Sequence, residues 1–280
     1  MKLRLVNDLH ILDHKVVPCS VKRGGSFLIY FALLAVVAIL YLFFIFPTQW
    51  LKLETVKQPI GINKTILQIS DLHFDRLRVP AIRIKKVIKE SNPDYIFLTG
   101  DFTYKERYLS YAAHYFKMFA DCGVPIYAVL GNHDYELPQL HKLLRLFDHY
   151  GIKLLRNESV SVGNFQLVGI DDYGTGHSKI NKSFQDVNDS KPIVIITHDP
   201  NVVLKLKRPY AYLMAGHLHG KQLNVPFFFT FKPKGPLSAK GIYKGLHSDE
   251  NGFYYISKGI GQAGVNARFM VRSEITLHQL

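Results

Sequence analysis

Five short polar runs hold the side chains of this 280-residue chain that are best suited to chemistry. Each contains aspartate, histidine or asparagine, and all but the last follow an apolar stretch rich in β-branched residues. The runs are Asp71-Leu72-His73, Gly100-Asp101, Gly131-Asn132-His133-Asp134, Thr197-His198 and Gly216-His217-Leu218-His219. Carboxylate, imidazole and amide groups without a thiolate favour Mn²⁺, iron or Zn²⁺ in a reactive site over a structural zinc.

The spacing of the runs places them at the ends of strands. Asp71, Asp101 and Asn132 are about thirty residues apart, which is the length of one βα unit. Parallel strands would bring these side chains to one edge of a sheet, where ligands bind in α/β folds. Each run alone is more typical of a turn or of a buried core histidine. All five at strand ends predict a single site.

This ligand set is too large for one ion. An aspartate that reaches two ions would make a two-metal site, with the ions about 3.5–4 Å apart. Such a pair lowers the pKa of bound water and stabilises the attacking and leaving oxygens of a displacement at phosphorus. The residues therefore predict hydrolysis of a phosphate ester.

Apolar periodicity predicts the elements that position these runs. Strands are expected at 65–70, 95–100 and 126–130, with helices at 79–91, 107–122 and 137–150. After Gly151 the chain becomes β-rich, with strands expected at 153–155, 159–162, 165–170, 193–197, 210–215, 253–257 and 275–277, and a helix at 201–206. The alternating first half predicts an α/β fold with a mostly parallel central sheet.

Residues 27–46 form an uncharged apolar run. A helix of that length spans about 30 Å, the thickness of bilayer hydrocarbon. A buried core helix and a cleaved signal peptide fit less well, because the run is long, rich in Phe and followed by no small-residue cleavage site. We divide the chain into a tail (1–26), a transmembrane helix (27–46), a linker (47–64) and a catalytic domain (65–280).

Charge gives a weak prediction of orientation and partners. Lys22 and Arg23 favour a cytoplasmic N-terminus, which would place the domain outside the cytoplasm. The net charge is +13, and residues 201–280 hold eleven Lys and Arg against three acids. Such a surface suits anionic partners, and beside a membrane segment it favours phospholipid over nucleic acid. Cys19 and Cys122 flank the segment and predict no disulfide.

The ordered set of five runs resembles the calcineurin-like metallophosphoesterase superfamily over about residues 65–280. That resemblance implies an α/β sandwich of two mixed β-sheets flanked by helices. It implies one ion held by Asp71, His73, Asp101 and His219, and a second held by Asp101, Asn132, His198 and His217, with Asp101 bridging. His133, oriented by Asp134, would stabilise the transition state or protonate the leaving oxygen, a role that suits an imidazole.

One motif departs from the superfamily pattern. Many members continue the second run with a further Asp or with Arg, whereas this chain reads Gly100-Asp101-Phe102-Thr103-Tyr104. The metal ligand is intact, but a contact supplied by the later position is in doubt.

The motifs Gly216-His217-Leu218-His219-Gly220-Lys221-Gln222 and Ser257-Lys258-Gly259-Ile260-Gly261 resemble a bacterial membrane-associated branch. It contains generic phosphodiesterases and UDP-2,3-diacylglucosamine hydrolases. The resemblance implies a single-pass protein of the bacterial inner membrane that acts on an amphipathic phosphorylated substrate and does not bind nucleic acid. A nucleotide-linked lipid is cytoplasmic and conflicts with the charge bias. A periplasmic phosphodiesterase of broad specificity and a non-catalytic membrane scaffold are the alternatives.

Two further stretches suggest contacts with substrate or membrane. Residues 225–231 contain four Phe and precede two Lys, a pattern that fits either a core strand or a lip at the bilayer. Residues 259–264 match a glycine-rich dinucleotide pattern, but no helix follows, which favours a loop beside the metal centre. The candidate contacts are Lys221, Phe227, Phe228, Phe229, Lys232, Lys234 and Gly261.

Overall fold

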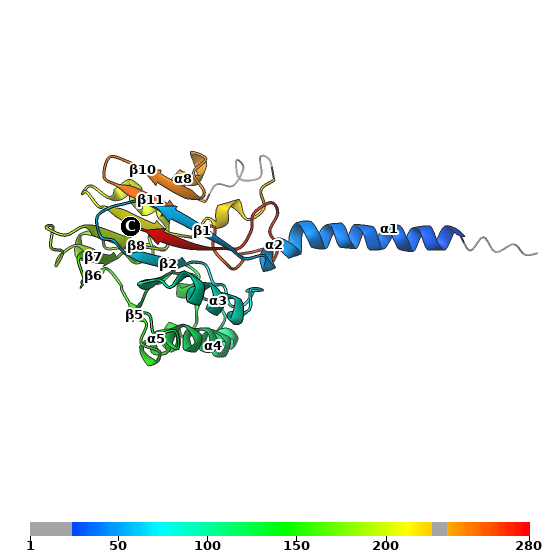
Figure 1. The fold of residues 1–280 in the computed structure, drawn as a ribbon, viewed down its shortest axis with the longest axis horizontal. Coiled ribbons are helices and arrows are strands. Elements are labelled where there is room, and N and C mark those ends of the chain that lie inside the picture. Colours follow the sequence, from blue (N-terminus) through cyan, green and yellow to red (C-terminus); the bar gives the residue numbers. More distant parts are fainter. Residues whose placement is uncertain (1–23, 226–233) are drawn as a thin grey trace, which may run out of the picture. The chain divides into compact units, whose positions relative to one another are not determined.

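The computed structural model describes residues 24–225 and 234–280, and the chain divides into two compact units, Met1–Ile39 and Leu40–Leu280. Helix α1 (Gly24–Leu40) begins in the first unit (Figure 1). It belongs to an apolar stretch, Phe27–Gln49, whose mean hydropathy is 2.9 and whose length suffices to cross a membrane. The described residues thus contain one candidate for the expected transmembrane helix.

The end of this stretch changes its helical geometry. A π-helical turn, η1 (Tyr41–Ile45), leads into α2 (Phe46–Gln49). Pro47, at the start of α2, has no N–H to donate to Phe43, and its ring would crowd that carbonyl in a regular α-helix. The wider turn before Pro47 relieves this conflict.

The Leu40–Leu280 unit contains two mixed sheets, each with six strands among the described residues. The first sheet has the order β1-β12-β2-β3-β4-β5, and β2 to β5 are parallel. Its strands are β1 (Lys52–Lys57), β12 (Glu274–Gln279), β2 (Thr65–Ile69), β3 (Tyr95–Thr99), β4 (Ile126–Val129) and β5 (Lys153–Leu154). Helices α3 (Ala81–Ser91), α4 (Leu109–Ala120) and α5 (Leu140–His149) pack on one face of this sheet through a large apolar cluster.

The second sheet has the order β10-β11-β9-β8-β7-β6, with β7, β8, β9 and β11 parallel. Its strands are β10 (Gly245–Ser248), β11 (Phe253–Ile256), β9 (Tyr212–Ala215), β8 (Ile193–Ile196), β7 (Phe165–Gly169) and β6 (Glu158–Val162). Its outer face carries the short elements α6 (Ile180–Ser183), η4 (Pro200–Lys205) and α8 (Pro236–Ala239). A second apolar cluster, including Phe97 and Val194, fills the space between the sheets.

The expected fold class is therefore confirmed, although several short elements were not expected or differ in type. Residues 47–64, expected to be a linker, contain β1, which pairs in parallel with β12. Strand β10 was not expected, and residues 201–206 fall in a 3₁₀ helix, η4, where an ordinary helix was expected. Pro200 at the start of η4 and the Asp199 side chain, which accepts from the Asn201 N–H, favour this tight turn.

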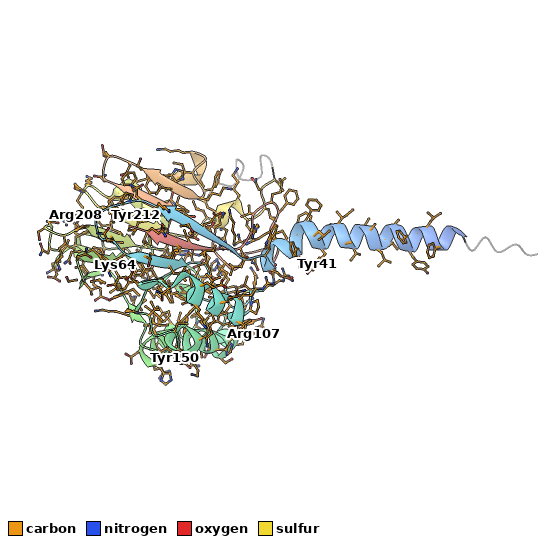
Figure 2. The ribbon with its side chains drawn as sticks, viewed as in Figure 1. Tyr41, Lys64, Arg107, Tyr150, Arg208 and Tyr212 are labelled. Carbon is orange, nitrogen blue, oxygen red and sulfur yellow. The ribbon has the colours of Figure 1, made fainter. Side chains whose placement is uncertain are left out.

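A buried polar network joins the two sheets. The His278 ring lies 3.0 Å from the hydroxyl of Tyr212, a residue that Figure 2 labels. The Gln68 amide donates to Ala215 O, so its oxygen faces the His278 Nε2–H at 3.0 Å. Gln68 and Ala215 each lie within three residues of a polar run, so the network fixes two strand ends relative to one another.

His278 should make the domain less stable in acid. Burial lowers its pKa to about 3, so below about pH 6.5 the unfolded chain binds a proton that the folded chain does not. Between pH 7 and pH 5 this costs about 2 kcal/mol of unfolding free energy. Urea unfolding of the full chain in detergent measures this loss of unfolding free energy. The loss should be smaller in His278→Gln than in the parent chain by about 2 kcal/mol. His114→Gln, at an exposed site on α4, should keep the full loss, and equal losses in all three proteins would contradict the account.

Candidate metal centre

The carboxyl ends of strands from both sheets meet at one place. Asp71 and His73 follow β2, Asp101 follows β3, and Asn132 follows β4. His198 follows β8, while His217 and His219 follow β9. The ligand atoms of Asp71, His73, Asp101 and His219 lie within 4.8 Å of one another, as do those of Asp101, His198 and His217. The structure brings six of the seven expected metal ligands into these two groups.

Asp101 belongs to both groups. Its Oδ2 lies 3.3 Å from His73 Nε2 and 3.2 Å from His198 Nε2. On either side, His219 Nε2 lies 3.3 Å from Asp71 Oδ1, and His198 Nε2 lies 3.2 Å from His217 Nδ1. One carboxylate thus stands between two sets of imidazoles, which is the arrangement that a bridging ligand needs.

The donors fit a bound cation. Both ring nitrogens of His73 and of His219 are buried, as is Asn132 Oδ1, and none has a hydrogen-bond partner among the described residues. Buried polar atoms are normally paired, because each unpaired one costs free energy. A cation would satisfy the one nitrogen lone pair that each neutral imidazole offers and the Asn132 oxygen, and the buried Asp/His cluster is therefore suited to holding metal.

The charge states of Asp101, His217 and His219 also suit metal binding, whereas at His198 the Asp101 carboxylate outweighs burial and holds the pKa of the imidazole well above its usual value. Burial opposes ionisation of Asp101, but the His198 and His73 imidazoles outweigh it and hold the pKa of this carboxyl well below its usual range. Burial is the main cause that lowers the pKa of both His217 and His219 well below the usual value. The second cause is a neighbouring histidine, which is His198 for His217 and His73 for His219. Ionised carboxylates and neutral imidazoles are the forms that bind divalent ions.

The backbone around the ligands is unusual. Five expected ligands have positive φ, a conformation that costs non-glycine residues free energy: Asp71 (54°), His73 (40°), Asp101 (58°), His217 (71°) and His219 (49°). Gly100 makes the close approach possible, since a Cβ there would lie 2.7 Å from the backbone nitrogen of Gly131. The strand ends are thus held in tight left-handed turns that point side chains inward.

The Asp134 side chain was expected to orient His133, but in the structure it bonds to the backbone instead. Its fully buried carboxylate accepts hydrogen bonds from the backbone N–H groups of Gly131, Asp101, Phe102 and Thr103, at 2.7–3.1 Å. The residue that lies against the His133 ring is Glu136, whose Oε1 is 3.0 Å from Nδ1. Asp134 thus ties two strand-end turns together because its side chain points back beneath them.

His133 lies beside the two groups and belongs to neither. Its ring is 5.1 Å from that of His73, edge to face, and its backbone N–H donates to Asp101 Oδ1. Tyr104, at the departure from the superfamily pattern, lies 5.5 Å from the same ring. Arg76 donates to the Tyr104 hydroxyl, so the residue at this departure is an aromatic side chain bonded to a basic one.

A cavity of about 470 Å³ opens beside the ligands, and the sequence analysis did not find it. It is lined by Asn132, Tyr135, Glu136, Gly174, Thr175, His177 and His217. The His177 and Tyr135 rings stack at 3.7 Å, and the Tyr135 hydroxyl donates to Asp171. The polar run 171–177 comes directly after β7, just as the other runs come directly after their strands. This position after a strand was the feature of the sequence from which the run could have been predicted to join the site.

Of the candidate residues for contact with substrate or membrane, some lie near the metal centre and others do not. The Gly261 N–H donates to Asp71 O at 2.8 Å, so the glycine loop packs against a ligand-bearing segment. Lys221 lines a separate cavity of about 280 Å³ with its ammonium 4.4 Å over the Tyr243 ring, and Lys234 is exposed. Phe227, Phe228, Phe229 and Lys232 lie outside the described residues.

Part of the basic surface lies away from the candidate span. Lys205, Lys207 and Arg208 line an open cavity of about 910 Å³, together with Lys179 and Lys182. Figure 2 shows Arg208 and Tyr41 at opposite ends of the Leu40–Leu280 unit.

Known proteins are similar to this chain in sequence. Residues 64–233 match the family described as calcineurin-like phosphoesterase. An uncharacterised metallophosphoesterase of Bacillus subtilis, YkoQ, is 36% identical, over 79% of this chain and 85% of its own. Escherichia coli phosphodiesterase YaeI is 28% identical (77% and 81%), and Chlamydia trachomatis UDP-2,3-diacylglucosamine pyrophosphatase LpxG is 24% identical (70% and 77%). The chain belongs to the calcineurin-like phosphoesterase family of metal-dependent phosphoric ester hydrolases.

Proposed function

We propose that this protein is a membrane-anchored phosphoesterase that uses two divalent ions to hydrolyse a phosphodiester or pyrophosphate bond. The observation that supports this most directly is the position of Asp101, which belongs to both ligand groups. We assign Asp71, His73, Asp101 and His219 to one ion, and Asp101, Asn132, His198 and His217 to the other. Mn²⁺ suits this set best, with iron or Zn²⁺ as alternatives.

The chemistry that two such ions supply is an activated water and charge neutralisation at phosphorus. The side chains of this protein do the rest. Most of the carboxylates and imidazoles that would hold the reacting groups are buried, so electrostatic interactions among them are strong. His133, whose side chain is 26% exposed, donates a proton to the leaving oxygen, and Asp134 keeps the two turns that carry Asp101 and Asn132 in register.

Hydrolysis of a soluble chromogenic phosphodiester by the full chain in detergent tests this proposal. Mn²⁺ should restore turnover to chelator-treated protein, because the ligand set cannot act without cations. Absence of turnover with Mn²⁺, Fe²⁺, Zn²⁺ and Co²⁺ alike would contradict an enzymatic role and favour the non-catalytic scaffold.

For the substrate we propose a lipid-linked phosphate such as UDP-2,3-diacylglucosamine. Two features support it, namely the relationship to the chlamydial pyrophosphatases and the candidate span at Phe27–Gln49. The alternative, a periplasmic phosphodiesterase of broad specificity, is supported by the charges of Lys22 and Arg23 and by the E. coli phosphodiesterase relative. For location we propose a single pass through a bacterial inner membrane.

A topology reporter fused after Leu280 separates these substrates. A cytoplasmic signal would agree with a nucleotide-linked lipid, which is found on that side. An extracytoplasmic signal would exclude that substrate and leave the periplasmic phosphodiesterase.

A further inference from the structure

The loop at residues 265–270, just before β12, exposes large apolar side chains. Met270 is 70% exposed and Val265 60%, and Met270 is held outward at a φ of 55°. Such exposure costs free energy in water, and contiguous apolar groups on a surface commonly mark a contact site.

This loop is joined to the end of the candidate span. The Phe269 ring stacks on Phe44 at 5.2 Å and lies 6.2 Å from Phe43. The Arg268 N–H donates to Phe44 O at 2.9 Å. Phe43 and Phe44 belong to the apolar stretch that ends at Gln49, so a bilayer that holds this stretch extends to the loop. Figure 1 shows the loop before β12 beside α2, within the same unit.

Arginines around residues 48–50 indicate the level of the lipid phosphates. Arg78 donates to the Thr48 hydroxyl, and Arg83 donates to Gln49 O. The Arg272 guanidinium lies 3.6 Å over the Trp50 ring. Arginine and tryptophan gather at the membrane–water interface, where the phosphates are. Arg78 also donates to Asn266 O at 2.8 Å, so the loop begins at this level. Phe44, which the loop contacts, precedes Thr48 by about one helical turn on the side of the apolar stretch.

The same loop is hydrogen-bonded to the metal centre along two routes. The Phe269 N–H donates to Gln222 O at 2.9 Å, three residues after His219. The fully buried Arg268 guanidinium donates to the carbonyls of Gly259 and Gly261, and Gly261 contacts the Asp71 backbone. The apolar surface is therefore the edge of the structure that holds two expected ligands.

We infer that the exposed side chains of residues 265–270 contact the lipid of the bilayer and hold the adjoining edge of the metal centre at the membrane, where a phosphate-bearing lipid can reach it. The continuous packing from Phe44 through Phe269 identifies the bilayer as the occupant of this surface. The inference rests on the proposed function for the hydrolysis. The membrane contact itself is independent of catalysis.

A fluorescent label tests the membrane contact. The full chain with Cys19→Ser and Cys122→Ser would carry one cysteine, Met270→Cys or, as control, Leu204→Cys, which is at a 44% exposed apolar site on η4. In phosphatidylglycerol nanodiscs, a nitrobenzoxadiazole dye at 270 should be quenched by doxyl-labelled lipid and protected from aqueous iodide. The dye at 204 should show the reverse. Equal iodide quenching at both sites, or protection without doxyl quenching, would overturn the inference, the latter by indicating a second copy or another protein as occupant.

Kinetics test whether this contact serves lipid substrates. Met270→Glu should lower hydrolysis of a phosphodiester lipid in vesicles by about tenfold, or about 1.4 kcal/mol, while hydrolysis of a soluble diester stays unchanged. Leu204→Glu should change neither rate. Equal loss on both substrates, or on neither, would overturn this role of the contact. If the parent chain hydrolyses no soluble diester, the proposed function fails, while the quenching result still decides whether the loop is in lipid.

Discussion

Asp101→Ala is expected to abolish hydrolysis and the loading of both metal ions. Asp101 is the one side chain common to the two ligand groups, and its carboxylate stands between His73 and His198. Removing it leaves two sets of buried imidazoles without a shared anion. The rate should fall by more than about 100-fold, the upper range for groups that only orient a ligand. Metal content by mass spectrometry and hydrolysis of a soluble diester measure the two effects.

The matched control for this change is Asp148→Ala. Asp148 is exposed on α5 and outside both groups, so its loss should leave rate and metal content unchanged. Asp101→Asn refines the test, because the amide oxygen can still accept from the His133 N–H while the negative charge is gone. Two bound ions and full turnover in Asp101→Ala would rule out the bridging role.

His133→Gln is expected to lower kcat by about 10²–10⁴-fold while both ions stay bound. The His133 ring lies beside the ligand groups without joining them, so its loss removes a proton donor and leaves the metal ligands in place. The deficit should be small for a nitrophenolate leaving group, which departs without a proton, and large for an alkoxide. Comparing kcat for an aryl and an alkyl phosphodiester measures this difference.

The outcome of that comparison separates two roles of His133. An equal deficit on both diesters would exclude proton donation and leave charge stabilisation as its role. Loss of metal from His133→Gln would instead make it a support of the ligand groups. His114→Gln, exposed on α4, is the matched control and should keep the parent rate on both substrates.

Local sequence was sufficient to predict the groups that meet at the strand ends. Asp71, Asp101 and Asn132 each follow an apolar strand, and parallel pairing of β2, β3 and β4 brings them together whatever the rest of the chain does. The cavity beside them followed the same rule, because its run at 171–177 comes directly after β7. It was missed because Gly174 and Thr175, which line it from this run, are not typical metal ligands.

Long-range pairing and side-chain direction were not predictable in this way. Strand β1 exists because it pairs with β12, more than 200 residues later, and the sequence 52–57 alone is only weakly apolar. The resemblance to the superfamily implied that Asp134 orients the His133 ring. The 3₁₀ turn that begins at Asp134 sends its carboxylate back to the backbone, and no sequence pattern indicates that direction.

The left-handed turns at Asp71, His73, Asp101, His217 and His219 have a consequence for the life of the protein in a cell. Each non-glycine residue in such a conformation costs about 1–3 kcal/mol, a cost that bound cations offset by binding only the folded chain. Newly made chains would therefore mature by capturing metal, and starvation for divalent ions would expose them to proteolysis. Cellular abundance of the protein should follow metal supply even when its synthesis is constant.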